Sequence, residues 1–134
     1  MGRKTTVLLV DDHPEFAMKI RDLLSPHFEI VGISHDGNSA LDAVRELHPD
    51  VVVLDIEMPG PSGIEVARLI RSSLLPSKIV FLTTHSDADY VRCALQTGAQ
   101  GYVFKSSLNR DLILALQEVI ADRTFVSDSQ SPRT

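Results

Sequence analysis

Val51-Val52-Val53-Leu54-Asp55 is the stretch of this sequence that decides the fold. Its apolar residues follow one another without alternation and end at a carboxylate. A strand that is buried on both faces has this pattern, and such strands occur in parallel sheets covered by helices. Similar runs are VLLV at residues 7–10 and IVFL at residues 79–82. The pattern therefore predicts a fold built around a parallel sheet.

Strand-like and helix-like segments alternate along the whole chain. The expected strands are residues 6–10, about 29–33, 51–54, 78–82 and 101–104. Apolar residues with the spacing of one helix face lie between and after them, as Phe16, Ile20, Leu23 and Leu24 do. Similar stripes are Leu41, Val44 and Leu47; Ile64, Ala67 and Ile70; Val91, Ala94 and Leu95; and Leu112, Leu116, Val119 and Ile120. This alternation predicts an α/β fold with right-handed crossovers.

Several residues have the chemistry of helix ends. Ser62 and Glu65 have the spacing of a capping box, and Asn38 is a candidate N-cap of the second helix. Ser86 is expected to precede the fourth helix, and Gly98 is suited to its C-terminal end. These signals place the helices between the expected strands.

Length and charge restrict the class of protein. The chain has 134 residues, which is enough for one domain, and a net charge of −5. The acidic balance argues against direct binding of nucleic acid by this domain. No apolar run approaches the roughly 20 residues of a membrane helix, so a cytoplasmic domain without membrane contact is expected. The lone Cys93 excludes an internal disulfide and is expected to pack on the fourth helix.

Polar side chains stand where the expected strands end. Asp11 and Asp12 follow the first strand, Asp55 the third, Thr83 the fourth and Lys105 the fifth. Ligands of open α/β sheets bind beyond these strand ends, so the side chains are expected to meet there. Three carboxylates repel one another unless a cation neutralises them, and oxygen ligands suit Mg²⁺ or Mn²⁺. Zinc is not expected without a Cys or His at the strand ends, and a carboxylate could also form an aspartyl phosphate.

Several short motifs follow one another along the chain: Val10-Asp11-Asp12-His13-Pro14, Asp55 with Met58-Pro59 and Gly63, Thr83, and Gly98-Ala99-x-Gly101-Tyr102-x-x-Lys105. In this order and spacing they resemble the receiver domain of two-component response regulators. The resemblance implies a flavodoxin-like or CheY-like α/β fold, with a five-stranded parallel sheet of order 2-1-3-4-5 and five helices on both faces. It leans toward receivers of LuxR/NarL/FixJ-type regulators. Residues 5–122 would form the receiver domain and residues 123–134 a polar tail or linker.

The resemblance also implies roles for the residues at the strand ends. Asp55 is similar to the phosphoacceptor, and Lys105 to the lysine that pairs with the phosphoryl oxygens. Thr83 resembles the hydroxyl that moves toward the phosphate, and Tyr102 the aromatic residue whose rotamer follows that movement. The implied ligands of Mg²⁺, or of Mn²⁺, are Asp11, Asp12, Asp55 and the backbone carbonyl of Glu57.

The function that follows from this resemblance is a phosphorylation switch rather than an enzyme. A sensor histidine kinase would donate the phosphoryl group, and the domain would assist its own phosphorylation and dephosphorylation. The fourth helix, fifth strand and fifth helix would then change to control a partner or an output domain. The LuxR-type motifs favour a DNA-binding output domain beyond residue 134, with control of transcription, and homodimer formation on phosphorylation.

Other interpretations stay open from the residues alone. A small Mg²⁺-dependent phosphatase also uses a strand-end Asp, but haloacid-dehalogenase-type enzymes have a second Asp where this chain has Glu57. A nucleotide- or flavin-binding module would need a Gly-rich loop in place of Asp11 and Asp12. A pseudo-receiver would keep the fold without Mg²⁺ binding. His13 is interpreted as a helix-entry residue before Pro14 rather than as a base or ligand.

Overall fold

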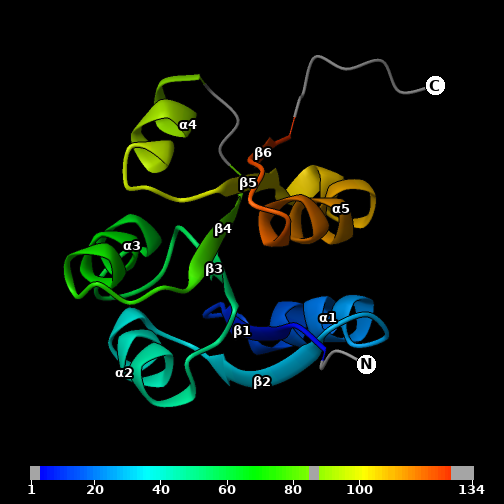
Figure 1. Ribbon diagram of the computed structural model, residues 1–134, viewed down its shortest axis with the longest axis horizontal. Coiled ribbons are helices and arrows are strands. Elements are labelled where there is room, and N and C mark those ends of the chain that lie inside the picture. The colour runs from blue at the N-terminus through cyan, green and yellow to red at the C-terminus, as the bar shows by residue number, and fades with distance from the viewer. Residues whose placement is uncertain (1–3, 85–87, 128–134) are drawn as a thin grey trace.

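The computed structural model describes residues 4–84 and 88–127 of the chain. Within these ranges a parallel sheet lies between two layers of helices (Figure 1). The strands are β1 (Thr6–Val10), β2 (Glu29–Ser34), β3 (Val51–Asp55), β4 (Lys78–Thr83), β5 (Gly101–Phe104) and β6 (Phe125–Val126). The helices are α1 (Pro14–Leu24), α2 (Gly37–Leu47), α3 (Gly63–Ser72), α4 (Ala88–Leu95) and α5 (Leu108–Ile120), with a 3₁₀ turn, η1, at Lys105–Ser107.

The sheet has the order β2-β1-β3-β4-β5-β6, and each neighbouring pair is parallel. The predicted α/β class, parallel pairing and five helices on two faces are confirmed. The predicted number of five strands is wrong, because β6 adds a sixth strand beside β5. The chain leaves α5, turns through Asp122 with a positive φ of 65°, and returns to pair Phe125 with Gly101. A two-residue strand is too short to show a periodic pattern.

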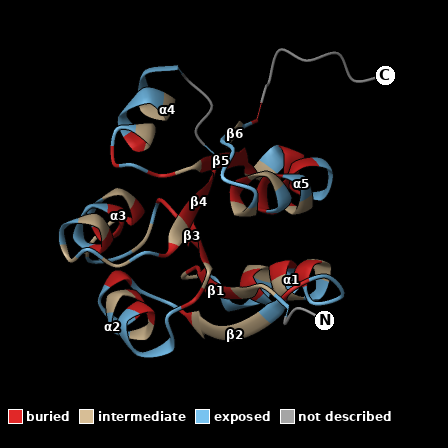
Figure 2. Ribbon diagram, viewed as in Figure 1, coloured by how far each residue is buried: buried red, intermediate tan, exposed pale blue. Residues whose placement is uncertain are grey.

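Two apolar cores lie on opposite faces of the sheet. One packs the buried sides of α2, α3 and α4, including Val44, Val66 and Ala94, against one face. The other packs α1 and α5, including Ile20 and Leu112, against the opposite face. Every residue of β3 is buried, as Figure 2 shows for the centre of the sheet. The continuous apolar runs therefore mark the central strands, as the sequence predicted.

The helix ends agree with the sequence in part. The capping box of α3 is confirmed, since Ser62 Oγ accepts from Glu65 N at 3.3 Å and Ser62 N donates to Glu65 Oε1 at 2.9 Å. Asn38 is not an N-cap, because α2 begins at Gly37 after Asp36. The Asp36 carboxylate accepts from the backbone N–H of Ser39 at 2.8 Å and occupies the cap.

Three further features concern the surface and the chain ends. Gly98 follows α4 with a φ of +92°, a conformation that glycine adopts without strain. Cys93 is exposed and does not pack, because the buried residue of α4 is its neighbour Ala94. Among residues 4–84 and 88–127, no helix has both the length and the apolar character needed to cross a bilayer. Ser86, and residues 128–134 of the expected tail, lie outside the described residues.

Candidate acidic site at the ends of the strands

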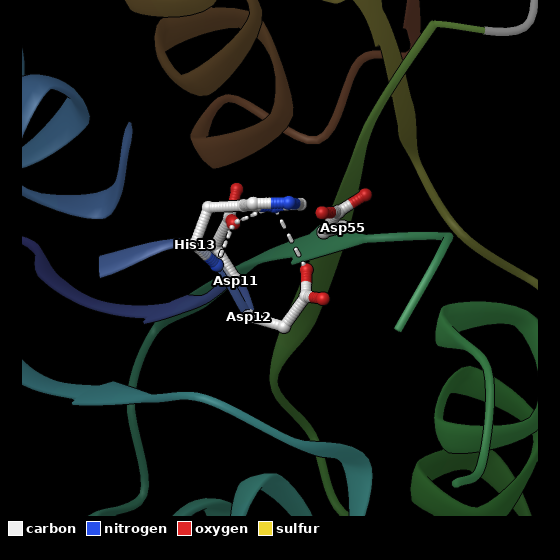
Figure 3. A group of neighbouring side chains, drawn as sticks. All are labelled: Asp11, Asp12, His13 and Asp55. Carbon is white, nitrogen blue, oxygen red and sulfur yellow. Dashed lines mark hydrogen bonds and ion pairs between the residues drawn. The ribbon is translucent and has the colours of Figure 1, made fainter. Parts of the chain in front are cut away.

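Four neighbouring side chains form an acidic cluster at the carboxyl edge of the sheet (Figure 3). Asp11 and Asp12 follow β1, and Asp55 is the last residue of β3, which pairs directly with β1. His13 comes next in the chain and lies beside them. One ligand atom from each of the four residues lies within 4.8 Å of the others. The structure thus brings together the three carboxylates that the strand order predicted.

The carboxylates of Asp11 and Asp55 are deeply buried, with exposed fractions of 1% and 2%. Asp11 Oδ1 accepts from the backbone N–H of His13 at 2.8 Å, and Asp55 Oδ1 accepts from that of Glu57 at 3.2 Å. Lys105 comes from the end of β5 and places its Nζ 3.3 Å from Asp55 Oδ2. The same ammonium lies 3.9 Å from Asp11 Oδ2. One cation therefore lies between two buried anions.

This environment changes the acidity of Asp55. Burial raises the pKa of the Asp55 carboxyl above its ordinary value of 3.8, because the charged form loses its hydration. The Lys105 ammonium lowers that pKa, and the nearby Asp11 carboxylate raises it again. Together these effects raise the pKa of Asp55, so Lys105 does not fully offset the effect of burial on it. The site is short of positive charge.

Two oxygens of the cluster fit a divalent cation. Asp11 Oδ2 and Asp12 Oδ1 are buried, and neither accepts a hydrogen bond of good geometry among the described residues. The nitrogen atoms near them are Lys105 Nζ, 3.9 Å from the first, and the imidazole Nδ1 of His13, 3.1 Å from the second. A buried carboxylate oxygen without a donor is costly, and a cation would satisfy it. Carboxylate oxygens are the ligands that Mg²⁺ and Mn²⁺ prefer. The residues present therefore fit such an ion.

His13 lies at the start of helix α1 and also beside the acidic cluster, a combination that the sequence did not predict. It is the N-cap residue of α1, before Pro14, as the sequence predicted, but its side chain makes no capping hydrogen bond. Its Nδ1 instead lies 3.1 Å from Asp12 Oδ1 and 3.5 Å from Asp11 Oδ1. The inference that no imidazole stands near the strand ends is therefore wrong. The cluster remains predominantly one of oxygen ligands.

The loop after β3 folds closely over Asp55. Gly63 begins α3, and its backbone N–H donates to the Ile56 carbonyl at 2.8 Å. A Cβ at this position would collide with the carbonyl oxygen of Asp55, so only glycine fits. Glu57 lies exposed on this loop, and its Oε1 accepts from the Thr84 hydroxyl at 3.4 Å. The acidic side chain thus extends across from the end of β3 to the end of β4.

Thr83 and Tyr102 come from β4 and β5, which follow β3 on one side of the sheet. Thr83 ends β4 and is completely buried. Tyr102 is also completely buried, and its ring packs edge-to-face against Phe81 and Phe104, with centroids 6.4 and 5.9 Å away. The Tyr102 ring therefore has the inward orientation in this structure.

One residue near the site was not predicted to be there. The Phe16 ring lies under the Lys105 ammonium, with 4.8 Å between Nζ and the ring centroid. The sequence placed Phe16 only in the apolar stripe of α1, because helical spacing says nothing about contacts with a distant strand end. The peptide between Lys105 and Ser106 is trans, as expected without a proline at this position.

The family model of the response regulator receiver domain matches residues 7–117. The chain belongs to the response regulator receiver domain family. This receiver domain is 33% identical over 129 residues to the nitrate/nitrite response regulator protein NarL of Escherichia coli (strain K12), a match that covers 95% of this chain. It covers 60% of NarL, so the chain spans well under two thirds of that relative's length.

Solved structures give the same classification. The receiver domain superposes on a two-component response regulator of the LuxR family from Aurantimonas sp. SI85-9A1 with a TM-score of 0.87 and 35% identity, covering 92% of this chain and 89% of that one. It also superposes on a DNA-binding response regulator of the LuxR family from Staphylococcus aureus with a TM-score of 0.80 and 31% identity, covering 87% and 98%. The resemblance inferred from the sequence motifs, with its LuxR/NarL lean, is confirmed.

Proposed function

We propose that this receiver domain accepts a phosphoryl group on Asp55 and acts as a switch, assisting its own phosphorylation and dephosphorylation rather than turning over a substrate. The observation that supports this most is the placement of the Asp55 carboxylate at the end of β3, 3.3 Å from the Lys105 ammonium. The buried oxygens of Asp11 and Asp12 beside it, which accept no hydrogen bond among the described residues, favour a cation at the same place. A nucleophile, a lysine and ligands for a metal are the parts that phosphoryl transfer needs.

In the proposed step, a carboxylate oxygen of Asp55 attacks the phosphorus of a phosphohistidine on a sensor histidine kinase. The new P–O bond forms as the P–N bond breaks, and the histidine keeps the electron pair of the broken bond. Lys105 Nζ lies where it can contact a phosphoryl oxygen on Asp55 Oδ2. The Thr83 hydroxyl, at the end of the adjacent β4, would donate to a second oxygen. Protein groups thus position and neutralise the transferred group.

Mg²⁺ is the proposed cofactor, and Mn²⁺ can take its place. The proposed ligands are the carboxylates of Asp11, Asp12 and Asp55 and the backbone carbonyl of Glu57. When bound, the ion supplies positive charge that offsets the carboxylates and the phosphoryl oxygens. The carboxylates of Asp11 and Asp12 would orient it and keep it beside Asp55.

The output of the switch is proposed from the family. Movement of Thr83 toward the phosphoryl group and reorientation of Tyr102 would bias a surface formed by α4, β5 and α5. We take residues 5–122 as the receiver domain, with β6 and Ser127 packed onto it. The residues after them would connect it to an output domain that binds DNA and regulates transcription. A cytoplasmic location and homodimer formation on phosphorylation belong to the same proposal.

Intact-mass measurement after incubation with acetyl phosphate and Mg²⁺ tests this proposal. The expected result is a gain of one phosphoryl group that is absent in Asp55→Asn and in a sample with EDTA. Asp42→Asn, which changes an exposed carboxylate on α2, is the matched control and should gain the group normally. If the wild-type chain gains no group, Mg²⁺-dependent binding of beryllofluoride is measured. Failure of both would identify a pseudo-receiver and contradict the proposal.

A further inference from the structure

The Lys105 side chain makes its described contacts through its ammonium. Its side chain is long and flexible, and it begins the short 3₁₀ turn η1, followed by Ser106 rather than by a rigid proline. The ammonium contacts Asp55 Oδ2 at 3.3 Å and Asp11 Oδ2 at 3.9 Å. Among the described residues, the ammonium also lies over the face of the Phe16 ring, with 4.8 Å between Nζ and the ring centroid. The direction of the ammonium thus depends on two carboxylates and one aromatic ring.

Open space lies next to this ammonium. A surface hollow of about 250 Å³ is lined by Phe16, Lys19, Lys105 and the residues of the turn into α5. A second hollow adjoins it, and Phe16, Lys19 and Lys105 line that one as well. A lysine beside such space can swing into water, where its charge is well hydrated. The two carboxylates favour the orientation toward Asp55, and a further contact would strengthen that preference before a phosphoryl group is present.

An aromatic ring is suited to this task. The face of a phenyl ring attracts a cation through its quadrupole and carries no net charge. A third carboxylate in its place would hold the lysine as well, but it would also repel an incoming phosphoryl group. Phe16 lies in the first turn of α1, directly after the Asp11–Asp12 loop, and it is half-buried against the core beneath α1. The core thus fixes the ring while its face stays available to Lys105.

We propose that Phe16 is a positioning residue for Lys105: its ring face holds the ammonium against Asp55 and Asp11, so that it is in place when the phosphoryl group arrives. The inference rests on the proposed function, because it takes Lys105 to contact the phosphoryl oxygens. The simpler alternative is that Phe16 only fills space under α1. In that case any apolar side chain of similar size would serve equally well.

Graded fluorination of Phe16 separates these two roles. Each fluorine weakens the negative potential of the ring face and changes the size and hydrophobicity of the side chain little. We expect the rate of phosphorylation by acetyl phosphate, at saturating Mg²⁺ and donor, to fall steadily from Phe through mono-, di- and trifluorophenylalanine. The total decrease should be roughly threefold to tenfold, the range of a partly desolvated cation–π contact. The same series at Phe28, in the core layer shared by α1, is the control and should leave the rate unchanged.

A second measurement examines the contact without phosphorylation. Lys105 Nζ lies 4.8 Å from the ring centroid, so the NMR resonances of the adjacent ε-methylene protons should be shifted upfield by the ring current. Phe16→Leu should return them to the ordinary position for lysine. Loss of this shift in a folded variant, together with a reduced rate of phosphorylation, would support the positioning role.

The outcomes distinguish the inference from the proposed function. If the wild-type chain is phosphorylated but the rate is the same across the Phe16 series, Phe16 only packs and the inference is wrong. An ordinary Lys105 resonance in the wild-type chain would also overturn it. If the wild-type chain accepts no phosphoryl group and binds no beryllofluoride, the proposed function fails and the positioning role fails with it.

Discussion

Ser127 Oγ donates a hydrogen bond to Asp111 Oδ2 at 2.7 Å, and so joins the end of β6 to α5. The same hydroxyl oxygen accepts from the backbone N–H of Phe104 at 3.1 Å, immediately before Lys105. Asp111 is buried, and the Arg110 guanidinium binds both of its oxygens at 2.8 and 3.1 Å. One buried hydroxyl therefore connects α5, β5 and the last described strand.

Ser127→Ala is expected to destabilise the domain. Removal of the hydroxyl takes a donor from a buried carboxylate and an acceptor from the Phe104 N–H, which should cost about 1–2 kcal/mol of the free energy of unfolding. Urea denaturation measures the change. Ser72→Ala, which removes an exposed hydroxyl that donates to the Leu69 carbonyl, is the control and should change stability little. Equal losses in the two variants would contradict the role given to Ser127.

Asp55→Asn is expected to stabilise the metal-free protein, and more so as the pH rises. The folded state raises the pKa of Asp55 above 3.8, so folding favours the protonated carboxyl. In the wild type, the protonated Asp55 carboxyl contributes to the free energy of unfolding below pH 3.8, and this contribution is lost as the pH rises through the raised pKa. The amide of the Asn variant does not titrate. The variant should be more stable than the wild type at neutral pH, and the difference should shrink in acid. Urea denaturation at a series of pH values, without Mg²⁺, measures this difference, and a pH-independent difference would refute it.

Asp12→Ala is expected to weaken Mg²⁺ binding about tenfold or more, because it removes a carboxylate from the proposed ligand set. The metal-free variant should be at least as stable as the wild type, since repulsion in the cluster decreases. A Mg²⁺ titration followed by NMR measures the affinity. Asp42→Ala removes an exposed carboxylate away from the strand ends and is the control. An affinity unchanged by Asp12→Ala would remove Asp12 from the metal site.

Glu57→Ala is expected to lengthen the lifetime of the phosphoryl group on Asp55. The Thr84 hydroxyl holds the Glu57 carboxylate between the ends of β3 and β4, where it can accept a hydrogen bond from an attacking water. Without it, hydrolysis should slow about threefold or more. The decay of the phosphorylated mass over time measures the lifetime, and Glu57→Gln tests whether the charge is required. The role of Glu57 is wrong if all three proteins lose the group at one rate.

Much of this protein could be predicted from local patterns. The unbroken apolar runs in β1, β3 and β4 predicted central strands, because a strand covered by helices on both faces has no polar side. The meeting of Asp11, Asp55 and Lys105 followed from the same inference. Parallel strands end at one edge, so the residues that follow them become neighbours without any knowledge of packing.

The misplaced predictions have local causes. Asn38 and Asp36 are both good caps, and only the extended backbone at Asp36, with a φ of −155°, decided which one begins α2. Cys93 lies one position before the buried Ala94, and a short helix that is apolar at most of its positions does not show which face is buried. A difference of one or two residues was enough to change each result.

The sequence alone determined the fold class, the order in which the polar site residues follow the strands, and the carboxylates that gather at the strand ends. Hydrophobic periodicity and strand direction carry this information. Only the tertiary structure decided that β6 pairs with β5, that His13 lies beside Asp12, and that the Phe16 ring lies under Lys105. These contacts join elements through short pairings and side-chain orientations. Neither a short strand pairing nor a side-chain orientation produces a periodic pattern in the sequence, and both depend on how the helices pack on the sheet.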